Sequence, residues 1–342
     1  LSQYAPGNFV NAVGLTNPGM TISAKLLEAL EVPDDKFLLT SIFGASLDEF
    51  VAVARCLAPF SDGLELNLSC PHAKGYGMAM GQDPALVHDI VKAVKAAVDI
   101  PVVPKLTPNT DRIQEIALAA VEAGADALCA INTVGPGYTS AFGEPVLSNG
   151  AGGMSGKGIL PIALKCVRDI RAISSVPIIG CGGISAAKDV AAMQAAGASI
   201  IGVGSALTGM TTKEIEVYFD TLVGDLTAKT ERAEGKIKYD IDMDFKPVTL
   251  SSNETVCRDI TLLTFEEDIE VKAGEFVFLW IPGVGEKPFS ALCDKPLTLV
   301  AIDVGEFTSS LMTLTPGTKT YIRGPHGQAV TPSPDQTVIA VA

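Results

Sequence analysis

Lys105 and Cys70 are the residues of this sequence whose types and positions most favour chemistry. Lys105 lies at the end of a strand-like run, in Pro104-Lys-Leu-Thr-Pro-Asn109. An unpaired buried ammonium is costly, so we expect this lysine to face an anion, either a ligand or a carboxylate of the chain itself. Cys70 follows another such run, in Leu66-Asn-Leu-Ser-Cys-Pro71. A thiol on a proline-containing loop, with no histidine in a matching loop, can accept a proton, although a lone cysteine is more often a core residue.

Three asparagines end or follow different strand-like runs: Asn11, Asn67 and Asn132. Each side-chain amide offers donors and an acceptor, which suits a planar ligand with several hydrogen-bonding groups. For any one asparagine alone, capping or turn formation is the alternative explanation. We expect the three amides to converge on one ligand.

Two glycine loops favour phosphate binding. Gly182-Gly183-Ile184 and Gly204-Ser205-Ala206 each follow a strand-like run. Glycines let backbone N–H groups approach an anion closely, and Ser205 adds a hydroxyl donor, whereas tight turns alone are the alternative. In a (β/α)8 barrel these would be the loops after strands seven and eight, which often bind phosphate. FMN fits such a pair beside Lys105, because negative charge develops at the N1–C2=O edge of a flavin on reduction.

A repeated strand–loop–helix pattern must position these residues. Between Phe37 and Leu207, short apolar or β-branched runs alternate with segments of helical spacing. The runs are Phe37–Ile42, Leu64–Leu68, Val102–Leu106, Leu128–Thr133, Pro177–Cys181 and Ser199–Gly204, and the helical segments are near 47–58, 84–98, 111–123, 159–174, 187–196 and 212–225. We therefore predict an α/β fold, a (β/α)8 TIM barrel. An open doubly wound sheet is disfavoured because polar residues stay at the C-terminal end of every run.

Six units are visible where a barrel has eight,. We interpret them as strands 3–8, with Asn11-Ala-Val-Gly-Leu-Thr-Asn-Pro-Gly19 as the loop after an absent second strand. The sequence also stops inside an apolar run, Thr337–Ala342, so we interpret it as an internal fragment of a longer polypeptide.

The architecture is predicted to change after the last helical segment. We assign residues 1–226 to the partial barrel, 227–245 to a charged linker without periodicity, and 246–342 to a second domain. Turns such as Ala273-Gly274 separate runs that alternate like antiparallel strands, which predicts a small antiparallel β-barrel. These runs are Val256–Phe265, Glu275–Ile281, Leu297–Ile302, Thr308–Leu314 and Lys319–Ile322.

Composition argues against several classes of function. A formal net charge of −14, without a basic stripe, disfavours nucleic acid as a partner,. The apolar runs are of strand length, far short of the roughly 20 residues that a membrane-spanning helix needs. Seven cysteines without CxxC or zinc-type spacing predict no metal site and suit reduced thiols in a cytoplasm,.

As an ordered set, these motifs resemble the class 1 dihydroorotate dehydrogenases of the NAD-linked type. The resemblance covers the predicted barrel through Asn11-Ala-Val-Gly-Leu, Asn67-Leu-Ser-Cys-Pro, Lys105-Leu-Thr-Pro-Asn, Ile131-Asn-Thr, Gly152-Gly-Met-Ser-Gly156, Gly182-Gly-Ile and Gly204-Ser-Ala. It implies oxidation of (S)-dihydroorotate to orotate in pyrimidine (UMP) biosynthesis, with the hydride passing to FMN and the C5 proton to Cys70. It also implies that the substrate contacts Asn11, Asn67, His72, Asn132 and Thr133, and that FMN contacts Lys105, Asn132, Ser155, Gly156, Gly182, Gly183, Gly204 and Ser205.

The sequence departs from that family at His72, where an asparagine is usual. The loop after Cys70 also resembles dihydropyrimidine dehydrogenase, but Met80 stands where that enzyme has its reactive cysteine, which favours dihydroorotate as the substrate. Oxidation of dihydrouracil or dihydrothymine is one alternative, and a non-flavin phosphate-binding barrel enzyme is another. The lysine that the family places near the end of its second strand would lie upstream of Leu1.

Residues from 246 onward resemble the flavin-binding barrel of the ferredoxin-reductase superfamily, as in the electron-transfer subunit of NAD-linked dihydroorotate dehydrogenases. Gly324-Pro-His-Gly327 matches its Gly-Pro-x-Gly turn, and Lys287-Pro-Phe-Ser290 occupies the place of Arg-Pro-x-Ser. The resemblance implies FAD bound by Lys287, Pro288, Phe289 and Ser290, although lysine lacks the bidentate phosphate recognition of arginine. It also implies an iron–sulfur centre and NAD site in a missing C-terminal part, an electron-transfer domain or subunit as partner, and a homo-oligomer.

Overall fold

The structure, a computed structural model, describes residues 1–69, 80–228 and 243–330. By their contacts these residues divide into two compact units. The first consists chiefly of residues 3–69, 80–137 and 152–228, and the second of 138–151 and 243–330. The predicted division differs from this one, because it placed residues 138–151 in the barrel and 243–245 in the linker.

The first unit is built on a curled parallel sheet of six strands in the order β12-β11-β6-β5-β4-β3. Because neighbours in the sheet follow one another in the chain, each strand-to-strand connection returns over the same face, as in a (β/α) barrel. The predicted α/β architecture is thereby confirmed. The strands are β3 (Leu39–Ile42), β4 (Gly63–Asn67), β5 (Val102–Leu106), β6 (Leu128–Ala130), β11 (Ile178–Cys181) and β12 (Ile200–Gly202).

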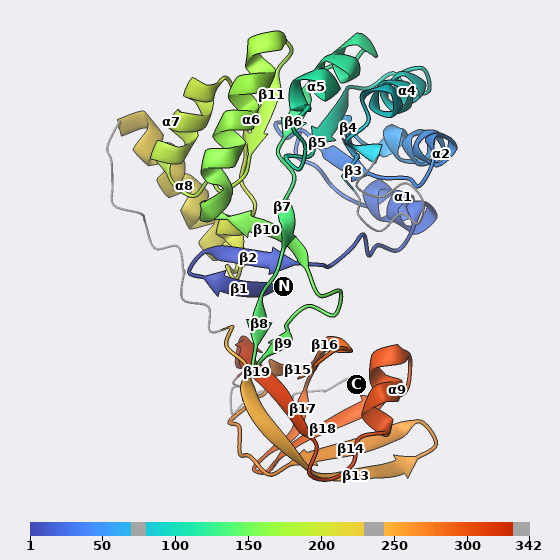
Figure 1. The fold of residues 1–342 in the computed structure, drawn as a ribbon, viewed down its shortest axis with the longest axis vertical. Coiled ribbons are helices and arrows are strands. Elements are labelled where there is room, and N and C mark those ends of the chain that lie inside the picture. The colour runs from blue at the N-terminus through green and yellow to red at the C-terminus, as the bar shows by residue number, and fades with distance from the viewer. Residues whose placement is uncertain (70–79, 229–242, 331–342) are drawn as a thin grey trace. The chain divides into compact units, whose positions relative to one another are not determined.

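Helices follow these strands and cover the outer face of the sheet (Figure 1). Some of them begin where a side chain accepts a backbone N–H group: Ser46 accepts from Glu49, and Asp83 accepts from Ala85,. One of them ends at Gly197, whose φ of 116° is the left-handed conformation that favours glycine,. The helices are α2 (Leu47–Leu57), α4 (Pro84–Lys95), α5 (Ile113–Glu122), α6 (Leu160–Ile173), α7 (Ala187–Ala196) and α8 (Thr212–Ala228).

A hydrophobic core fills the space between sheet and helices. Phe50, Leu64, Ile90, Leu128 and Ile178 are each 0% exposed. Burying a side chain of this size contributes roughly 1.5–3 kcal/mol, so this layer holds the strand ends that carry the site.

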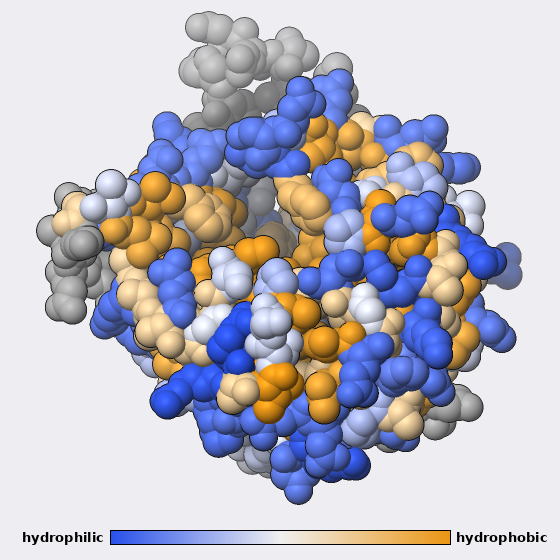
Figure 2. Space-filling model, turned by 90° about the horizontal axis from the view of Figure 1, so that it is seen from above, coloured by the Kyte–Doolittle hydropathy of each residue, from blue (hydrophilic) through white to orange (hydrophobic). Residues whose placement is uncertain are grey.

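Strands β3 and β12 are the two edges of this sheet within the described residues. Phe37, before β3, and Ile200, in β12, are both more than half exposed. A closed eight-stranded barrel would pair two further strands at these edges. On the face that Figure 2 displays, hydrophobic side chains lie in several patches between hydrophilic ones.

A second, antiparallel sheet in this unit was not predicted. Its order is β1-β2-β10-β7, and Asn11 pairs with Gly153 across it. The sequence interpretation began with the loop Asn11–Gly19, assigned no strand before it, and missed helix α1 (Met20–Glu28). The four strands are β1 (Ser2–Ala5), β2 (Asn8–Asn11), β7 (Val134–Gly137) and β10 (Gly152–Gly156).

The second unit is a seven-stranded antiparallel sheet in the order β16-β15-β19-β13-β14-β18-β17. Its two edge strands, β16 and β17, are consecutive in the chain and separated only by Ser290, so the sheet must curl to bring its edges together. Leu250, Phe265, Leu279, Leu299 and Leu311 fill its core. The strands are β13 (Lys246–Cys257), β14 (Ile260–Phe265), β15 (Glu275–Ile281), β16 (Gly285–Phe289), β17 (Ala291–Asp294), β18 (Leu297–Ile302) and β19 (Lys319–Gly327).

Two predicted strands of this unit were wrong. Val256–Phe265 spans two strands, because the chain turns after Cys257 and re-enters the sheet at Ile260. Thr308–Leu314 lies mostly in helix α9 (Glu306–Met312), whose start is fixed by Thr308 Oγ1 accepting from the N–H groups of Val304 and Gly305. The predicted strand Thr337–Ala342 and most of the predicted linker lie outside the described residues; α8 itself continues to Ala228.

Residues 138–151, here called the arm, run out from β7 and return to β10 through a short hairpin of β8 (Ser140–Ala141) and β9 (Glu144–Pro145). Within the second unit, Val146 of the arm joins Phe245 and Trp280 in a small buried cluster. Phe142 stacks on Tyr321, with ring centroids 4.5 Å apart. The arm is therefore part of the second unit's packing, although both of its ends belong to the first.

Candidate functional site

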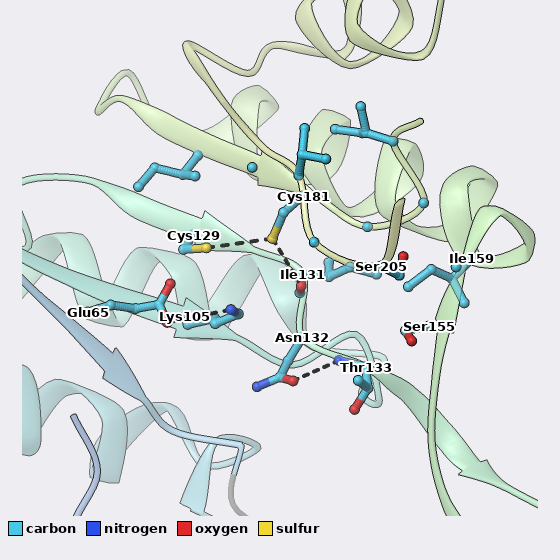
Figure 3. Close-up of a pocket in the computed structure, with 18 of the residues that line it drawn as sticks. Glu65, Lys105, Cys129, Ile131, Asn132, Thr133, Ser155, Ile159, Cys181 and Ser205 are labelled. Atoms are coloured by element: carbon cyan, nitrogen blue, oxygen red, sulfur yellow. Dashed lines mark hydrogen bonds and ion pairs between the residues drawn. The ribbon is translucent and has the colours of Figure 1, made fainter. Parts of the chain in front are cut away.

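A cavity of about 420 Å³ opens at the C-terminal ends of the parallel strands (Figure 3). This size lies within the usual range for small-molecule sites of roughly 300–1,000 Å³. The carboxyl ends of the strands are also where (β/α) barrels place their active sites. Polar and small residues line it, among them Glu65, Lys105, Cys129, Asn132, Thr133, Ser155, Gly156, Cys181, Gly182, Gly183, Gly204 and Ser205.

Lys105 of β5 points into this cavity beside Glu65 of β4. Its Nζ lies 3.5 Å from Glu65 Oε1, and the two side chains are 26% and 11% exposed. Burial lowers the pKa of Lys105, but the Glu65 carboxylate and the neighbouring thiols outweigh it, so the pKa is raised above its usual value. Lys105 therefore stays charged at the cavity wall. The sequence alone allowed a carboxylate of the chain as its partner without naming one, and the structure shows that this residue is Glu65.

Two thiols lie next to this ion pair. Cys129 Sγ and Cys181 Sγ are 3.7 Å apart, and Cys181 Sγ donates to the carbonyl oxygen of Ile131 at 3.2 Å. The pKa of Cys129 is raised well above its usual range, mainly by the hydrogen bond between the thiols and secondly by burial. The same hydrogen bond, assisted by the charge of Lys105, lowers the pKa of Cys181.

A chain of amides lies at the ends of β4 and β6. Asn132 Nδ2 donates to Asn67 Oδ1 at 3.1 Å, and Asn132 Oδ1 accepts from Thr133 N at 2.8 Å. Asn109 donates to the carbonyl oxygen of Thr133 at 3.1 Å and so fixes the segment that follows β6. The arrangement holds Asn132 and Thr133 against the cavity with their conformations already set.

The glycine loops form the opposite wall. Gly183 has φ +77°, and a Cβ placed there would lie 2.8 Å from Leu160 N and 2.9 Å from Gly156 O. Glycine is therefore required for the turn after β11 to approach the start of α6. At Gly204 a Cβ would meet nothing within 4 Å, because this backbone faces open space. Together with the Ser205 hydroxyl, these turns can accommodate a phosphate group.

The segment before α7 is held by a carboxylate from the first turn of that helix. The buried carboxylate of Asp189 accepts from Ser185 N at 3.0 Å, Ser185 Oγ at 2.9 Å and Ala186 N at 3.0 Å. This carboxylate therefore holds the segment between the turn Gly182-Gly183 and α7 in place.

The predicted barrel site residues fall into three groups. Those that line the cavity are Lys105, Asn132, Thr133, Ser155, Gly156, Gly182, Gly183, Gly204 and Ser205. Asn67 joins them through its bond to Asn132, whereas Asn11 lies on β2 and donates to the carbonyl oxygen of Gly153 at 3.3 Å. Cys70 and His72 lie outside the described residues.

The predicted FAD-contacting residues Lys287, Pro288, Phe289 and Ser290 belong to the second unit, at and just after β16. Lys287 and Pro288 are exposed, and Phe289 packs against Phe307 at a centroid distance of 6.3 Å. Ser290 lines a cavity of about 190 Å³ with Lys272 and Gly274.

Sequence reasoning missed Glu65, Cys129 and Cys181 as lining residues. A signal was present, because Glu65 and Asn67 lie two residues apart on one strand and must share a face. Across residues 1–69, 80–228 and 243–330, no group of three or more His, Cys, Asp or Glu side chains is arranged to hold a metal ion. No helix in the part of the chain that the structure describes is long and apolar enough to cross a membrane.

Comparison with solved structures shows a similar fold. A ligand-free DHODH from Eimeria tenella superposes with a TM-score of 0.55 at 21% identity, over 68% of this chain and 76% of that chain. DHODH from the same organism in complex with ferulenol gives a TM-score of 0.50 at 21% identity, over 67% of this chain and 69% of that chain.

Sequence comparisons identify the family. The catalytic subunit of dihydroorotate dehydrogenase B (NAD(+)) from Pyrococcus horikoshii is 47% identical over 203 residues, 59% of this chain and 66% of the relative. The subunit of that name from Methanocaldococcus jannaschii is 47% identical over 206 residues, 58% of this chain and 66% of the relative. The chain thus spans about two thirds of the length of these curated relatives. The family model "Dihydroorotate dehydrogenase" matches residues 2–218, and the chain therefore belongs to this family.

Proposed function

We propose that this protein is a flavin-dependent dihydroorotate dehydrogenase, which oxidises (S)-dihydroorotate to orotate in pyrimidine biosynthesis. The observation that carries the proposal is one cavity lined by a charged lysine, by Asn132 with its hydrogen-bonded partner Asn67 behind it, and by two glycine turns. Membership of the dihydroorotate dehydrogenase family supports the same reaction.

The residues of the cavity fit FMN. The turns at Gly183 and Gly204, with the Ser205 hydroxyl, offer a site for its phosphate, and Gly204 faces open space. Lys105 would lie at the pyrimidine edge, and Ser155 and Gly156 of β10 would border the ring system. When bound there, FMN would supply the hydride acceptor of the reaction.

The amides would hold the substrate. Asn132 and Asn67 are already joined by a hydrogen bond, so their free donor and acceptor positions are pre-oriented before a ligand arrives,. Thr133 would add a hydroxyl, and Asn11 and His72 complete the proposed set. The positive charge of Lys105 would favour negative charge that develops at the pyrimidine edge during the reaction.

The proposed proton acceptor is Cys70, three residues after Asn67 in the sequence. It would take the proton from C5 of dihydroorotate while the hydride leaves C6. A positioned thiol performs this role best when it is deprotonated, so the reaction should accelerate as pH rises toward about 8.5, the usual pKa of a cysteine.

We further propose that the second unit is an electron-transfer domain that binds FAD. Support comes from its curled antiparallel sheet and from the position of Lys287–Ser290 at the junction of its two edge strands. The cavity beside Ser290, at about 190 Å³, would hold only part of a dinucleotide,. Electrons would then pass from FMN through FAD and an iron–sulfur centre to NAD, in keeping with the relatives' NAD(+)-linked name.

Anaerobic mixing of the purified protein with dihydroorotate, followed at the flavin absorbance, tests the barrel function. We expect rapid bleaching, with about one FMN per chain released by acid. Chromatography of the released cofactor would show FAD as well if the second unit binds it. Bleaching by dihydrouracil but not by dihydroorotate would replace the proposed substrate, and absence of any flavin would refute the proposed class of enzyme.

A further inference from the structure

Glu65 is a buried carboxylate on the cavity wall to which the proposed reaction assigns no role. The residue is 8% exposed and stands between two fully buried leucines of β4. Its Oε1 accepts a hydrogen bond from Ser41 Oγ at 2.9 Å, and Lys105 Nζ lies 3.5 Å from the same oxygen. Taking a carboxylate out of water costs several kcal/mol, so a simple structural ion pair would be an expensive choice at this position.

Strand register explains how the three side chains meet. Strands β3, β4 and β5 are adjacent and parallel, with Ser41 level with Glu65 and Asn67 level with Lys105. Lys105 must therefore reach back toward the N-terminal end of its neighbour to meet Glu65. Figure 3 shows the carboxylate and the ammonium pointing toward one another along the cavity wall. Both side chains line the cavity, and the ammonium lies next to the carboxylate on that wall.

We propose that Glu65 is a positioning residue for the flavin chemistry. It keeps the ammonium of Lys105 charged and holds it at the pyrimidine edge of FMN, and the negative charge of Glu65 offsets part of the electric field of that ammonium. This inference rests on the proposed function, because it requires FMN in the cavity. In this role Glu65 acts on the flavin through Lys105.

The groups around Lys105 set the expected pH dependence. Besides Glu65 on β4, the titratable groups that act on it are the thiols of Cys129 on β6 and Cys181 on β11. Burial lowers the pKa of Lys105, and the carboxylate is the first of the groups that oppose this effect. Without the carboxylate, burial should dominate, and Lys105 should lose its proton at a lower pH than in the parent protein.

The test is the midpoint potential of bound FMN in the parent and in Glu65→Gln, measured from about pH 6 to about pH 10, a range over which the parent's Lys105, with its raised pKa, keeps its proton,. Glutamine keeps an acceptor for Ser41 and Lys105 but removes the charge. At the acid end of this range, the Lys105 ammonium of the variant lacks its counter-charge. It should therefore shift the FMN equilibrium roughly tenfold toward the reduced form, which raises the midpoint potential by about 30 mV for a two-electron couple. As pH rises and the variant's Lys105 is deprotonated, the difference should shrink to less than about threefold, or ~14 mV.

Glu115→Gln provides a matched control, because it removes the same charge from an exposed site on α5 where Glu115 pairs with Arg112 at 2.6 Å. The FMN midpoint potential of Glu115→Gln should stay within ~14 mV of the parent's at every pH, because solvent screens an exposed charge. Superimposable curves for Glu65→Gln and the parent would overturn the inference. So would a shift that stays constant over the whole range, since Glu65 would then act on the flavin directly rather than through Lys105.

If Glu65→Gln does not fold, Glu65→Asp retains the charge but withdraws it by one methylene. Its potential should match the parent at low pH and depart from it at high pH; identity with the parent at every pH would overturn the inference. A parent protein without FMN would overturn the proposed function and this inference together. A parent whose FMN is bleached by dihydroorotate, with an unaltered Glu65→Gln potential, would overturn the inference alone.

Discussion

Replacing Gly183 by alanine tests whether the turn after β11 is part of the cofactor site. The residue has φ +77°, and the added Cβ would lie 2.8 Å from Leu160 N and 2.9 Å from Gly156 O. Both neighbours are backbone atoms, so they can make room only by moving the turn itself. Gly156 lines the cavity, and its displacement would change the space offered to the ligand.

The expected effect has two parts. The left-handed conformation costs an alanine roughly 1–2 kcal/mol. Overpacking against fixed neighbours typically adds about 1–3 kcal/mol. With each kcal/mol lowering Tm by roughly 2–4 °C in a unit of this size, thermal unfolding should begin about 4–20 °C earlier. FMN should bind at least tenfold more weakly, which corresponds to about 1.4 kcal/mol.

Gly150→Ala is the matched control. Gly150 has nearly the same dihedral, φ +73°, but a Cβ there would meet nothing within 4 Å. It should lose only the conformational part of the stability, and because Gly150 lies in the arm, the Tm of the smaller second unit should fall by about 4–16 °C,. Titration of the apoprotein with FMN, followed by quenching of flavin fluorescence, measures affinity in both variants. Equal affinity in Gly183→Ala and the parent, or equal loss in both variants, would refute the assignment of this turn to the cofactor site.

Three further predictions concern groups at and beyond the cavity. Cys70→Ala should reduce its FMN 10²- to 10⁴-fold more slowly in rapid mixing with dihydroorotate, roughly the contribution of a positioned base, and a rate within about threefold of the parent would exclude Cys70 as that base. His72→Asn should flatten any change of the Michaelis constant near pH 6.5, the usual histidine pKa, and an unaltered pH profile would assign His72 a structural role. Arg323→Met removes the bidentate partner of Glu286; the Arg323 side chain is only 4% exposed and that of Glu286 is 17% exposed. It should destabilise the second unit by about 3–5 kcal/mol in denaturant unfolding followed by the fluorescence of Trp280, the one tryptophan of the sequence, and a loss below about 1 kcal/mol would contradict a desolvated pair,.

The parallel sheet could be predicted from sequence because each βα unit carries its own local signals. Val102–Leu106 and Ala187–Ala196 were predicted with the bounds that the structure shows. The second ends at Gly197, where the left-handed conformation stops the helix whatever the rest of the fold does. Glu275–Ile281 and Leu297–Ile302 in the second unit are likewise strands with the predicted bounds.

Long-range pairings could not be predicted in the same way. Asn11 donates a hydrogen bond to Gly153, 142 residues away, and the residue types around Asn11 and around Gly153 do not by themselves indicate a strand. The contact of Lys105 with Glu65 depends on two strands being neighbours with a particular register. Sequence could place a lysine in the cavity and require a counter-charge, but only the assembled sheet selects Glu65.

Local signals also misled where side-chain capping decided the outcome. The run Thr308–Leu314 alternates in a way that suggests a strand. Two N–H groups nevertheless bond to Thr308 Oγ1, and Phe307 and Leu311 lie one helical turn apart on the core. Helix spacing and capping together therefore outweigh the two-residue alternation.

The arm has a practical consequence for dissecting the molecule. Because its Val146 is buried with Phe245 and Trp280, a shortened chain that ends after α8 would expose this apolar segment to water. Such a chain should aggregate more readily than its barrel sequence suggests, unless the arm is trimmed or its hydrophobic side chains are replaced. Conversely, a protease that nicks the chain only between α8 and β13 would leave the second unit attached through the arm, so gel filtration under native conditions should still recover both pieces together.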